Sequence, residues 1–298
     1  MKKIIDGAFL STLESLDLNV KQVMNGGFGG NRRSAAYGTS TEFADYREYA
    51  QGDDIRRIDW NIYARFEKLF IKLYVDEKQL HHRIYIDTSA SMDFGEPKKS
   101  VAALRIAAAL GFISVQAMDK VSFYALYEKE CEDLSQTVVG REAFYSAVNG
   151  LNALEFDGDT DLYASMKACE RPGRDDGISF IISDFFTDSD WKSAVDWLLF
   201  RGRQVVLVQV VSRDEISPGM SGKIQLMDAE AINEEDLKNF KMEITRTSIK
   251  AYTQALEYHE NEIRKFCAAR GVGFMTVCSD ESIERVFFKK GLEAEVVK

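Results

Sequence analysis

Short apolar runs alternate with longer amphipathic segments over most of the chain. The runs have the length and the aliphatic or aromatic content of buried strands, and they cover residues 84–86, 121–127, 177–183, 204–211 and 272–277. The segments between them repeat apolar residues at helical spacing, and they cover residues 98–118, 142–154, 191–200 and 247–270. Strands and helices that alternate in this way predict an α/β fold with a doubly wound, mostly parallel sheet flanked by helices.

Weaker patterns predict a few further elements. A helix is expected to start after residue 161 and to run through Cys169, a hairpin is expected over 223–228, and a final helix over 282–292.

The pattern changes ahead of the sheet, which predicts an N-terminal extension at 1–79 and the α/β domain with its C-terminal helices at 80–298. In the extension, apolar residues at helical spacing predict a helix over 4–24. Alternation of apolar and polar residues over 69–75 predicts a half-buried edge strand.

A glycine-rich loop with two arginines, residues 25–34, follows the predicted first helix. A phosphate-binding loop of this composition would lead from a strand into a helix, whereas here a helix precedes the glycines. We therefore interpret the loop as structural, with contact of an anion or a partner peptide by Arg32 and Arg33 as the alternative.

Residues 43–65 interleave aromatic side chains with charges of both signs. In one interpretation, arginine–carboxylate pairs hold this segment on the next domain. Its apolar anchors on the main core would then be Ile55, Ile58, Trp60 and Ile62. In the other interpretation, aromatic and arginine side chains form a surface for a partner, as at many interaction hot spots. The candidates for that surface are Arg56, Arg57, Trp60 and Arg65.

The overall composition is that of an ordinary folded protein, with 45% apolar and 29% charged residues. A formal net charge of −10 argues against binding to nucleic acid or to anionic membranes, which requires basic surfaces. A basic protein partner is compatible with this charge, although many soluble proteins are equally acidic. Acidic residues within the first 17 positions interrupt any signal peptide, and no apolar run reaches the roughly eighteen residues of a membrane span. We therefore predict a cytoplasmic protein without membrane insertion.

The cysteines and histidines are few and widely spaced. The four cysteines form no C-x-x-C pair, so we expect neither a zinc site nor a disulfide framework. His81 and His82 are neighbours that would point to opposite faces of a strand, and His259 lies elsewhere in the sequence. The pattern argues against a histidine metal site and against a Ser-His-Asp triad.

A cluster of oxygen ligands follows the predicted strand at 84–86. Asp87-Thr88-Ser89-Ala90-Ser91 places a carboxylate and two hydroxyls beyond the carboxyl end of that strand, where ligands bind in open α/β sheets. Thr160 opens a later helix, and Asp184 ends a second buried strand. If these strands are neighbours, the side chains form a hard oxygen shell suited to Mg²⁺, with Mn²⁺ or Ca²⁺ as alternatives. The candidate ligands are Asp87, Ser89, Ser91, Thr160 and Asp184. The alternative is that the serines merely cap the next helix.

The parts of this cluster resemble the metal-ion-dependent adhesion site of von Willebrand factor A domains. The matching motifs are Asp87 to Ser91, Gly158-Asp159-Thr160-Asp161-Leu162 and Ser183-Asp184. The resemblance covers about residues 80–285, and Asp159 stands where many relatives carry glycine.

A second resemblance lies ahead of the sheet. The stretch from Tyr49 to Trp60, followed by Ala64-Arg65, is similar to the signature of a MoxR-associated bacterial family of unknown function, domain of unknown function family fifty-eight. This resemblance implies an association with MoxR-type AAA+ ATPases. It also gives the interpretation of 43–65 as a partner surface equal standing with the anchoring interpretation.

These observations predict a non-catalytic, divalent-metal-dependent protein–protein interaction module, a partner or adaptor of a MoxR-type AAA+ ATPase in chaperone-like maturation. Asp87 and Asp184 would anchor the ion, and Ser89 and Ser91 would complete its inner shell. Thr160 would join when an acidic side chain of the ATPase or its client binds, and the resemblance implies a linked shift of the final helices. The alternative is a metal-dependent hydrolase that uses the same site, although no general base is visible in the sequence. A third alternative is a purely structural domain whose site stays empty.

Overall fold

The computed structural model describes residues 4–14, 43–74, 79–169, 177–187, 189–218, 222–226, 240–244 and 246–287. The chain divides into a small unit, Gly29–Gln79, and a large unit that combines Met1–Phe28 with Leu80–Lys298. The first helix therefore groups with the large unit, and not with the segment that follows it.

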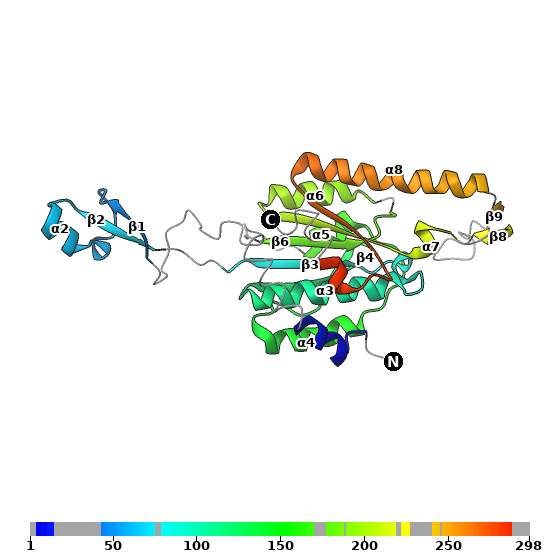
Figure 1. Ribbon diagram of the computed structural model, residues 1–298, viewed down its shortest axis with the longest axis horizontal. Helices are drawn as coiled ribbons and strands as arrows, with labels where there is room; N and C mark the ends of the chain where they lie inside the picture. The colour runs from blue at the N-terminus through cyan, green and yellow to red at the C-terminus, as the bar shows by residue number, and fades with distance from the viewer. Residues whose placement is uncertain are drawn as a thin grey trace. The chain divides into compact units, whose positions relative to one another are not determined.

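A mixed sheet forms the centre of the large unit (Figure 1). In the described residues it has the strand order β10-β7-β6-β3-β4-β5. The strands are β3 (His81–Asp87), β4 (Lys120–Tyr127), β5 (Glu130–Asp133), β6 (Ile178–Ser183), β7 (Gln204–Val211) and β10 (Gly273–Cys278). All neighbours pair in parallel except β4 and β5, which are antiparallel. The predicted fold class, a doubly wound and mostly parallel sheet, is confirmed.

Helices cover both faces of this sheet (Figure 1). One apolar core lies under α3 (Lys99–Gln116) and α4 (Gly140–Ala153), and it includes Ile5, Phe9 and Leu13 from the N-terminal segment. The other core lies under α5 (Leu162–Cys169), α6 (Trp191–Phe200) and α8 (Arg246–Arg270). Burial on both faces explains why the central strands are continuous apolar runs and do not alternate with polar residues.

The helix α3 is long and apolar enough to cross a membrane by length and composition, and among the described residues it is the one helix that meets this test. Within the fold, 78% of it is buried. Because it packs against the sheet and α4, its apolar character is explained by its place in the core.

Close backbone packing fixes how β3 and β6 lie against each other. Gly177 precedes β6 with a φ of +151°, and a β-carbon there would lie 2.1 Å from the carbonyl oxygen of His81. Only glycine allows this approach. In the resulting register Ile86 pairs with Ile182, so Asp87 lies level with Ser183.

Several predicted boundaries differ from the structure. The N-terminal helix covers 7–14, and the remainder of the predicted 4–24 helix after residue 14 lies outside the described residues. The predicted hairpin is wider than expected, because β8 (Gly222–Leu226) pairs with the distant strand β9 (Phe240–Ile244). The final helix α9 is only Ile283–Arg285, and residues 288–292 lie outside the described part.

The small unit has its own two-stranded antiparallel sheet, in which β1 (Phe43–Glu48) pairs with β2 (Phe70–Tyr74). The 3-10 turn η1 (Ile55–Arg57) and the helix α2 (Trp60–Phe66) connect them. The carboxylate of Asp59 accepts hydrogen bonds from the first turn of α2 and pairs with Lys72 at 3.0 Å. This buried cap ties the helix to the sheet.

Of the four side chains predicted to anchor this segment on the main core, one is buried, but within the small unit itself, and Ile62 is half-buried. Ile58 is buried, and it packs with Ile71 and Leu73 in the core of the small unit. Ile55 and Trp60 are instead 64% and 62% exposed. The expectation that they are buried anchors is therefore wrong, because the small unit closes its core without them.

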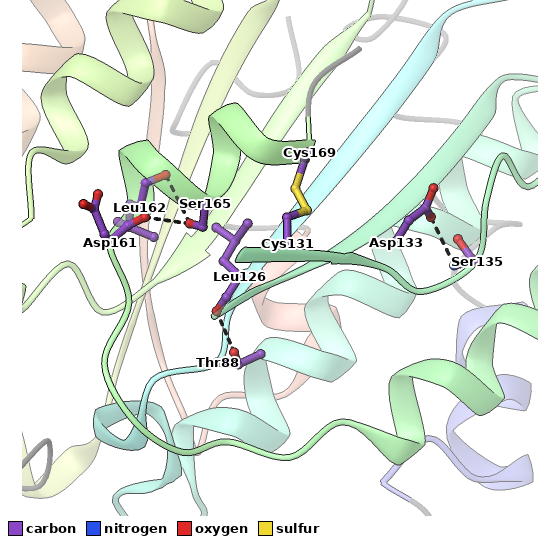
Figure 2. Close-up of a disulfide and its surroundings, with 9 residues drawn as sticks. All are labelled: Thr88, Leu126, Cys131, Asp133, Ser135, Asp161, Leu162, Ser165 and Cys169. Atoms are coloured by element: carbon purple, nitrogen blue, oxygen red, sulfur yellow. Dashed lines mark hydrogen bonds between the residues drawn. A yellow bond between two sulfur atoms is a disulfide. The ribbon is translucent and has the colours of Figure 1, made fainter. Parts of the chain in front are cut away.

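A disulfide joins β5 to the end of α5 (Figure 2). Cys131 and Cys169 are 38 residues apart in sequence, with their α-carbons 5.4 Å apart. The expectation of no disulfide is therefore wrong. The bond depends on β5, a short polar strand that the apolar pattern did not predict.

Reduction of this disulfide is expected to lower the free energy of unfolding by about 2–4 kcal/mol, because the closed loop restricts the unfolded chain. Urea unfolding with and without dithiothreitol measures the difference. The double variant Cys131→Ser/Cys169→Ser should lose the response to reductant, whereas Cys278→Ser, a free cysteine, should keep it. Four reactive thiols in the unreduced, denatured protein would contradict the bond.

Candidate metal centre

The predicted ligands lie where the winding of the sheet changes direction. Numbered in chain order, the strands of the described sheet run 3-2-1-4-5-6, and the direction changes between β3 and β6. Asp87 is the last residue of β3, and Asp184 directly follows β6. In open α/β sheets the crevice at such a point is the usual ligand site. The fold therefore brings together the two carboxylates that the sequence separates by almost a hundred positions.

A chain of hydrogen bonds links the serines to Asp184. Asp87 Oδ1 accepts a bond from the backbone N–H of Ser89 at 3.0 Å. The Ser89 and Ser91 hydroxyls lie 3.1 Å apart, and the Ser91 hydroxyl donates to Asp184 Oδ2 at 2.8 Å. Ser89 precedes the turn η2 (Ala90–Asp93), but its side chain makes no capping bond there. The alternative that Ser89 merely caps the next helix is therefore not what the structure shows.

Backbone hydrogen bonds hold the Thr160 loop beside the serine loop. The N–H of Ala90 donates to the carbonyl of Gly158 at 2.9 Å. The Thr160 hydroxyl donates to the carbonyl of Leu126 at 3.3 Å, and its nearness to the Asp87 carboxylate lowers the pKa of that group. The same Leu126 carbonyl accepts a 2.6 Å bond from Thr88 (Figure 2). The five predicted ligands thus converge on one place.

The site is almost closed to solvent. Asp87, Thr160 and Asp184 are each 2% exposed, Ser89 is 3% exposed, and Ser91 is half-buried. Burial, and then the nearby Asp184 carboxylate, raise the pKa of Asp87, while bonds from Ser183, Ser89 and Thr160 oppose the rise. Two carboxylates this deeply buried need a positive charge beside them.

The donor set fits a hard divalent cation. Two carboxylates and three hydroxyls offer only oxygen, the ligand type that Mg²⁺ prefers, and neutral hydroxyls leave room for retained water. No group of three or more His, Cys, Asp or Glu side chains suited to a metal occurs in the described residues. The predicted site differs from such a group because most of its ligands are hydroxyls.

The sequence did not reveal the role of a buried lysine. Lys99 lies in the first turn of α3, and its ammonium group donates to Asp184 Oδ2 at 2.7 Å and to Glu215 Oε1 at 2.6 Å. Glu215 belongs to α7 (Arg213–Ile216), which follows β7. A cation at a helix N-terminus opposes the helix dipole. This conflict was a signal in the sequence that Lys99 has a partner elsewhere.

A histidine also lies closer to the site than expected. The Nε2 atom of His259, on α8, lies 3.1 Å from the carbonyl oxygen of Phe185. Its ring packs on the ring of Phe186, with the two ring centroids 5.4 Å apart. The sequence indicated no histidine near the predicted site, whereas His259 contacts the backbone of the residue after Asp184. Because a carbonyl oxygen only accepts, Nε2 must carry the proton, so this nitrogen is a donor and not a base.

The predicted partner-binding residues belong to the small unit. Arg56, Trp60 and Arg65 are exposed there, and Arg57 is half-buried. Arg32 and Arg33 lie outside the described residues. Exposed aromatic and arginine side chains are typical of interaction surfaces. That a partner binds here stays a prediction.

The chain is similar to uncharacterised mycobacterial proteins. It is 26% identical over 243 residues to Rv1480 of Mycobacterium tuberculosis, a match that covers 76% of this chain and 73% of the relative. Mb1516 of Mycobacterium bovis gives the same values.

Among solved structures, the chain is similar to BatB from Bacteroides thetaiotaomicron, with a TM-score of 0.44 and 12% identity over 73% of this chain and 97% of that chain. It is also similar to the SpRpn10 VWA domain, with a TM-score of 0.40 and 8% identity over 70% of this chain and 92% of that chain.

A doubly wound sheet with buried aspartate, serine and threonine side chains at its point of reversal defines a von Willebrand factor A-like domain. The chain belongs to the family described as "Protein of unknown function DUF58", whose family model matches residues 45–261. The predicted family and fold are therefore confirmed. The association with MoxR-type ATPases stays a prediction.

Proposed function

We propose that the protein is a non-catalytic, divalent-metal-dependent interaction module. The observation that supports this most directly is that Asp87, Asp184, Ser89 and Thr160 are buried together with the half-buried Ser91 at the carboxyl edge of the sheet, where hydrogen bonds link both serines to Asp184. Asp87 and Asp184 would hold the ion with Ser89 and Ser91, and Thr160 would adjust when a partner binds. A bound Mg²⁺ would supply a Lewis-acidic position for a carboxylate from outside, with Mn²⁺ or Ca²⁺ as substitutes.

The proposed partner is a protein that presents an acidic side chain, a MoxR-type AAA+ ATPase or its client, in the cytoplasm. Hydroxyl ligands are neutral, so the ion would keep much of its charge and would attract such a carboxylate. The chain's own role is to orient the hydroxyls and to shield the site from bulk solvent. The exposed Arg56, Trp60 and Arg65 of the small unit would add contacts to the same partner.

The helix α8 is well placed to respond to changes at the site. Its His259 contacts the backbone of Phe185, the residue after Asp184. Thr187, in the same loop, donates from its hydroxyl to the carbonyl of Thr160 at 3.5 Å. A rearrangement of the 184–187 loop on partner binding would therefore be transmitted to α8, which supports the predicted shift of the final helices.

Capture of a purified MoxR-type ATPase tests this proposal. The immobilised protein is expected to retain the ATPase in Mg²⁺ and to release it in chelator. Thr160→Ala should weaken capture about tenfold or more, because a missing hydroxyl at a charged centre costs about 1.5–3 kcal/mol. The matched variant Thr160→Ser keeps the hydroxyl and should retain the ATPase.

Three results would count against the proposal. Capture that persists in chelator would exclude a metal-dependent contact. Metal-dependent capture by Thr160→Ala at wild-type strength would exclude the role of Thr160. Turnover of the ATPase's client by the purified protein alone would favour the hydrolase alternative.

A further inference from the structure

Lys99 is the one fully buried lysine side chain in the described part of the chain, with 1% of its surface exposed. Its neighbour Lys98 is half-exposed and pairs with Asp93 on the surface at 2.6 Å. A buried ammonium group is costly to desolvate unless it is paired and hydrogen-bonded. The fold therefore places this charge at the site and surrounds it with partners.

The first partner of Lys99 is a ligand atom of the proposed metal centre. Asp184 Oδ2 accepts a bond from the Lys99 ammonium group at 2.7 Å and another from the Ser91 hydroxyl at 2.8 Å. The same oxygen thus faces both the serine cluster and the lysine. A divalent ion on this oxygen would lie close to a like charge, which weakens its binding in a buried site.

The second partner of Lys99 is held in place independently of the first. Glu215 forms a capping box with Ser212, in which Glu215 Oε2 accepts the Ser212 N–H at 2.7 Å. This leaves Oε1 for the lysine, at 2.6 Å. The ring of Phe186 adds a third contact, 5.6 Å from the ammonium nitrogen to the ring centroid. The ammonium group can therefore stay buried and paired when Asp184 binds something else.

We infer that Lys99 is a positioning residue that sets the metal affinity of this centre, and that Glu215 holds its ammonium group when a divalent cation takes Asp184. The inference rests on the proposed metal-binding function and deepens it. Without an ion, Lys99 supplies the positive charge that Asp184 needs. With an ion, Glu215 neutralises Lys99 and limits the repulsion between the two cations. Lys99 and Glu215 together would make Mg²⁺ binding reversible and keep the fold intact with and without the ion.

Titration calorimetry with MgCl₂ on the full chain tests this inference through two substitutions with opposite effects. Lys99→Met removes the competing charge and is expected to tighten Mg²⁺ binding about tenfold or more. Glu215→Gln removes the partner that neutralises Lys99 and is expected to weaken binding by a similar factor. The matched controls are Lys98→Met and Asp214→Asn, which remove neighbouring exposed charges and should bind like the wild type.

Opposite shifts support the inference, because a purely structural role would weaken binding in both variants. If Lys99→Met unfolds in chelator and refolds in Mg²⁺, that result also supports it, since the ion then replaces the lost charge. Wild-type affinity, or weaker binding, in Lys99→Met overturns the inference, and so does tighter binding in Glu215→Gln. If the wild type itself shows no Mg²⁺ binding, the proposed metal function fails. The other outcomes test only the role of Lys99 and Glu215 and leave the proposed metal function standing.

Discussion

Asp87→Asn is expected to abolish the stabilisation of the protein by Mg²⁺. An ion that binds only the folded state adds about 2.7 kcal/mol at a hundredfold excess over its Kd. For a domain of this size that corresponds to roughly 5–10 °C in Tm. Asparagine keeps the size of the side chain but removes the charge that would hold the ion. Thermal melts of both proteins in Mg²⁺ and in chelator measure the effect.

The same variant has a second expected signature in chelator. Burial and the Asp184 carboxylate raise the pKa of Asp87, so the ionised group is unfavourable in the folded protein at neutral pH. Asp87→Asn should therefore melt at or above the wild-type Tm when no divalent ion is present. The control Asp214→Ala removes an exposed carboxylate and should keep the wild-type response. Identical melting of wild type and Asp87→Asn in all conditions would contradict the metal centre.

Gly177→Ala is expected to destabilise the large unit by about 3 kcal/mol or more. The added β-carbon would meet the carbonyl oxygen of His81 at 2.1 Å and its carbonyl carbon at 2.7 Å. These are backbone atoms of a central strand, so no side-chain rotation relieves the contact. The positive φ of Gly177 adds conformational strain. Urea unfolding gives the change in free energy.

Gly140→Ala separates the two contributions to this effect. Gly140 also has a positive φ, +79°, but nothing lies within 4 Å of an added β-carbon. It should cost only the strain, about 1 kcal/mol. A Gly177→Ala variant no less stable than Gly140→Ala would show that β3 and β6 can move apart freely. Because their register aligns Asp87 with Ser183, Gly177→Ala should also lose its response to Mg²⁺.

The central strands and helices were predictable because each is long, apolar and continuous. The strand 204–211 and the helix 191–200 begin and end where the pattern places them. Buried on both faces, such strands need apolar residues at every position, and few other structures produce that pattern. The proximity of the Asp87 and Asp184 carboxylates could be expected as well, since both residues stand at the ends of strands of this kind.

The elements that escaped prediction depend on contacts between distant parts of the chain. The strand β5 is polar and pairs along one edge, so it leaves no apolar pattern, and the disulfide that depends on it was missed. The partners of Lys99 lie 85 and 116 positions away. Trp60 was ambiguous because an aromatic side chain between charges suits a core and a surface equally. Only the packing of neighbouring residues decides between them.

The polar edge strand β5 also bears on how the protein avoids aggregation. An edge strand leaves backbone groups open to pairing with the sheet of another molecule. Glu130, Glu132 and Asp133 are all exposed on this short strand. Two copies that joined through it would bring like charges together, which is destabilising. The acidic residues that made β5 unrecognisable from the apolar pattern are thus the ones that oppose edge-to-edge pairing of the sheet with a second molecule.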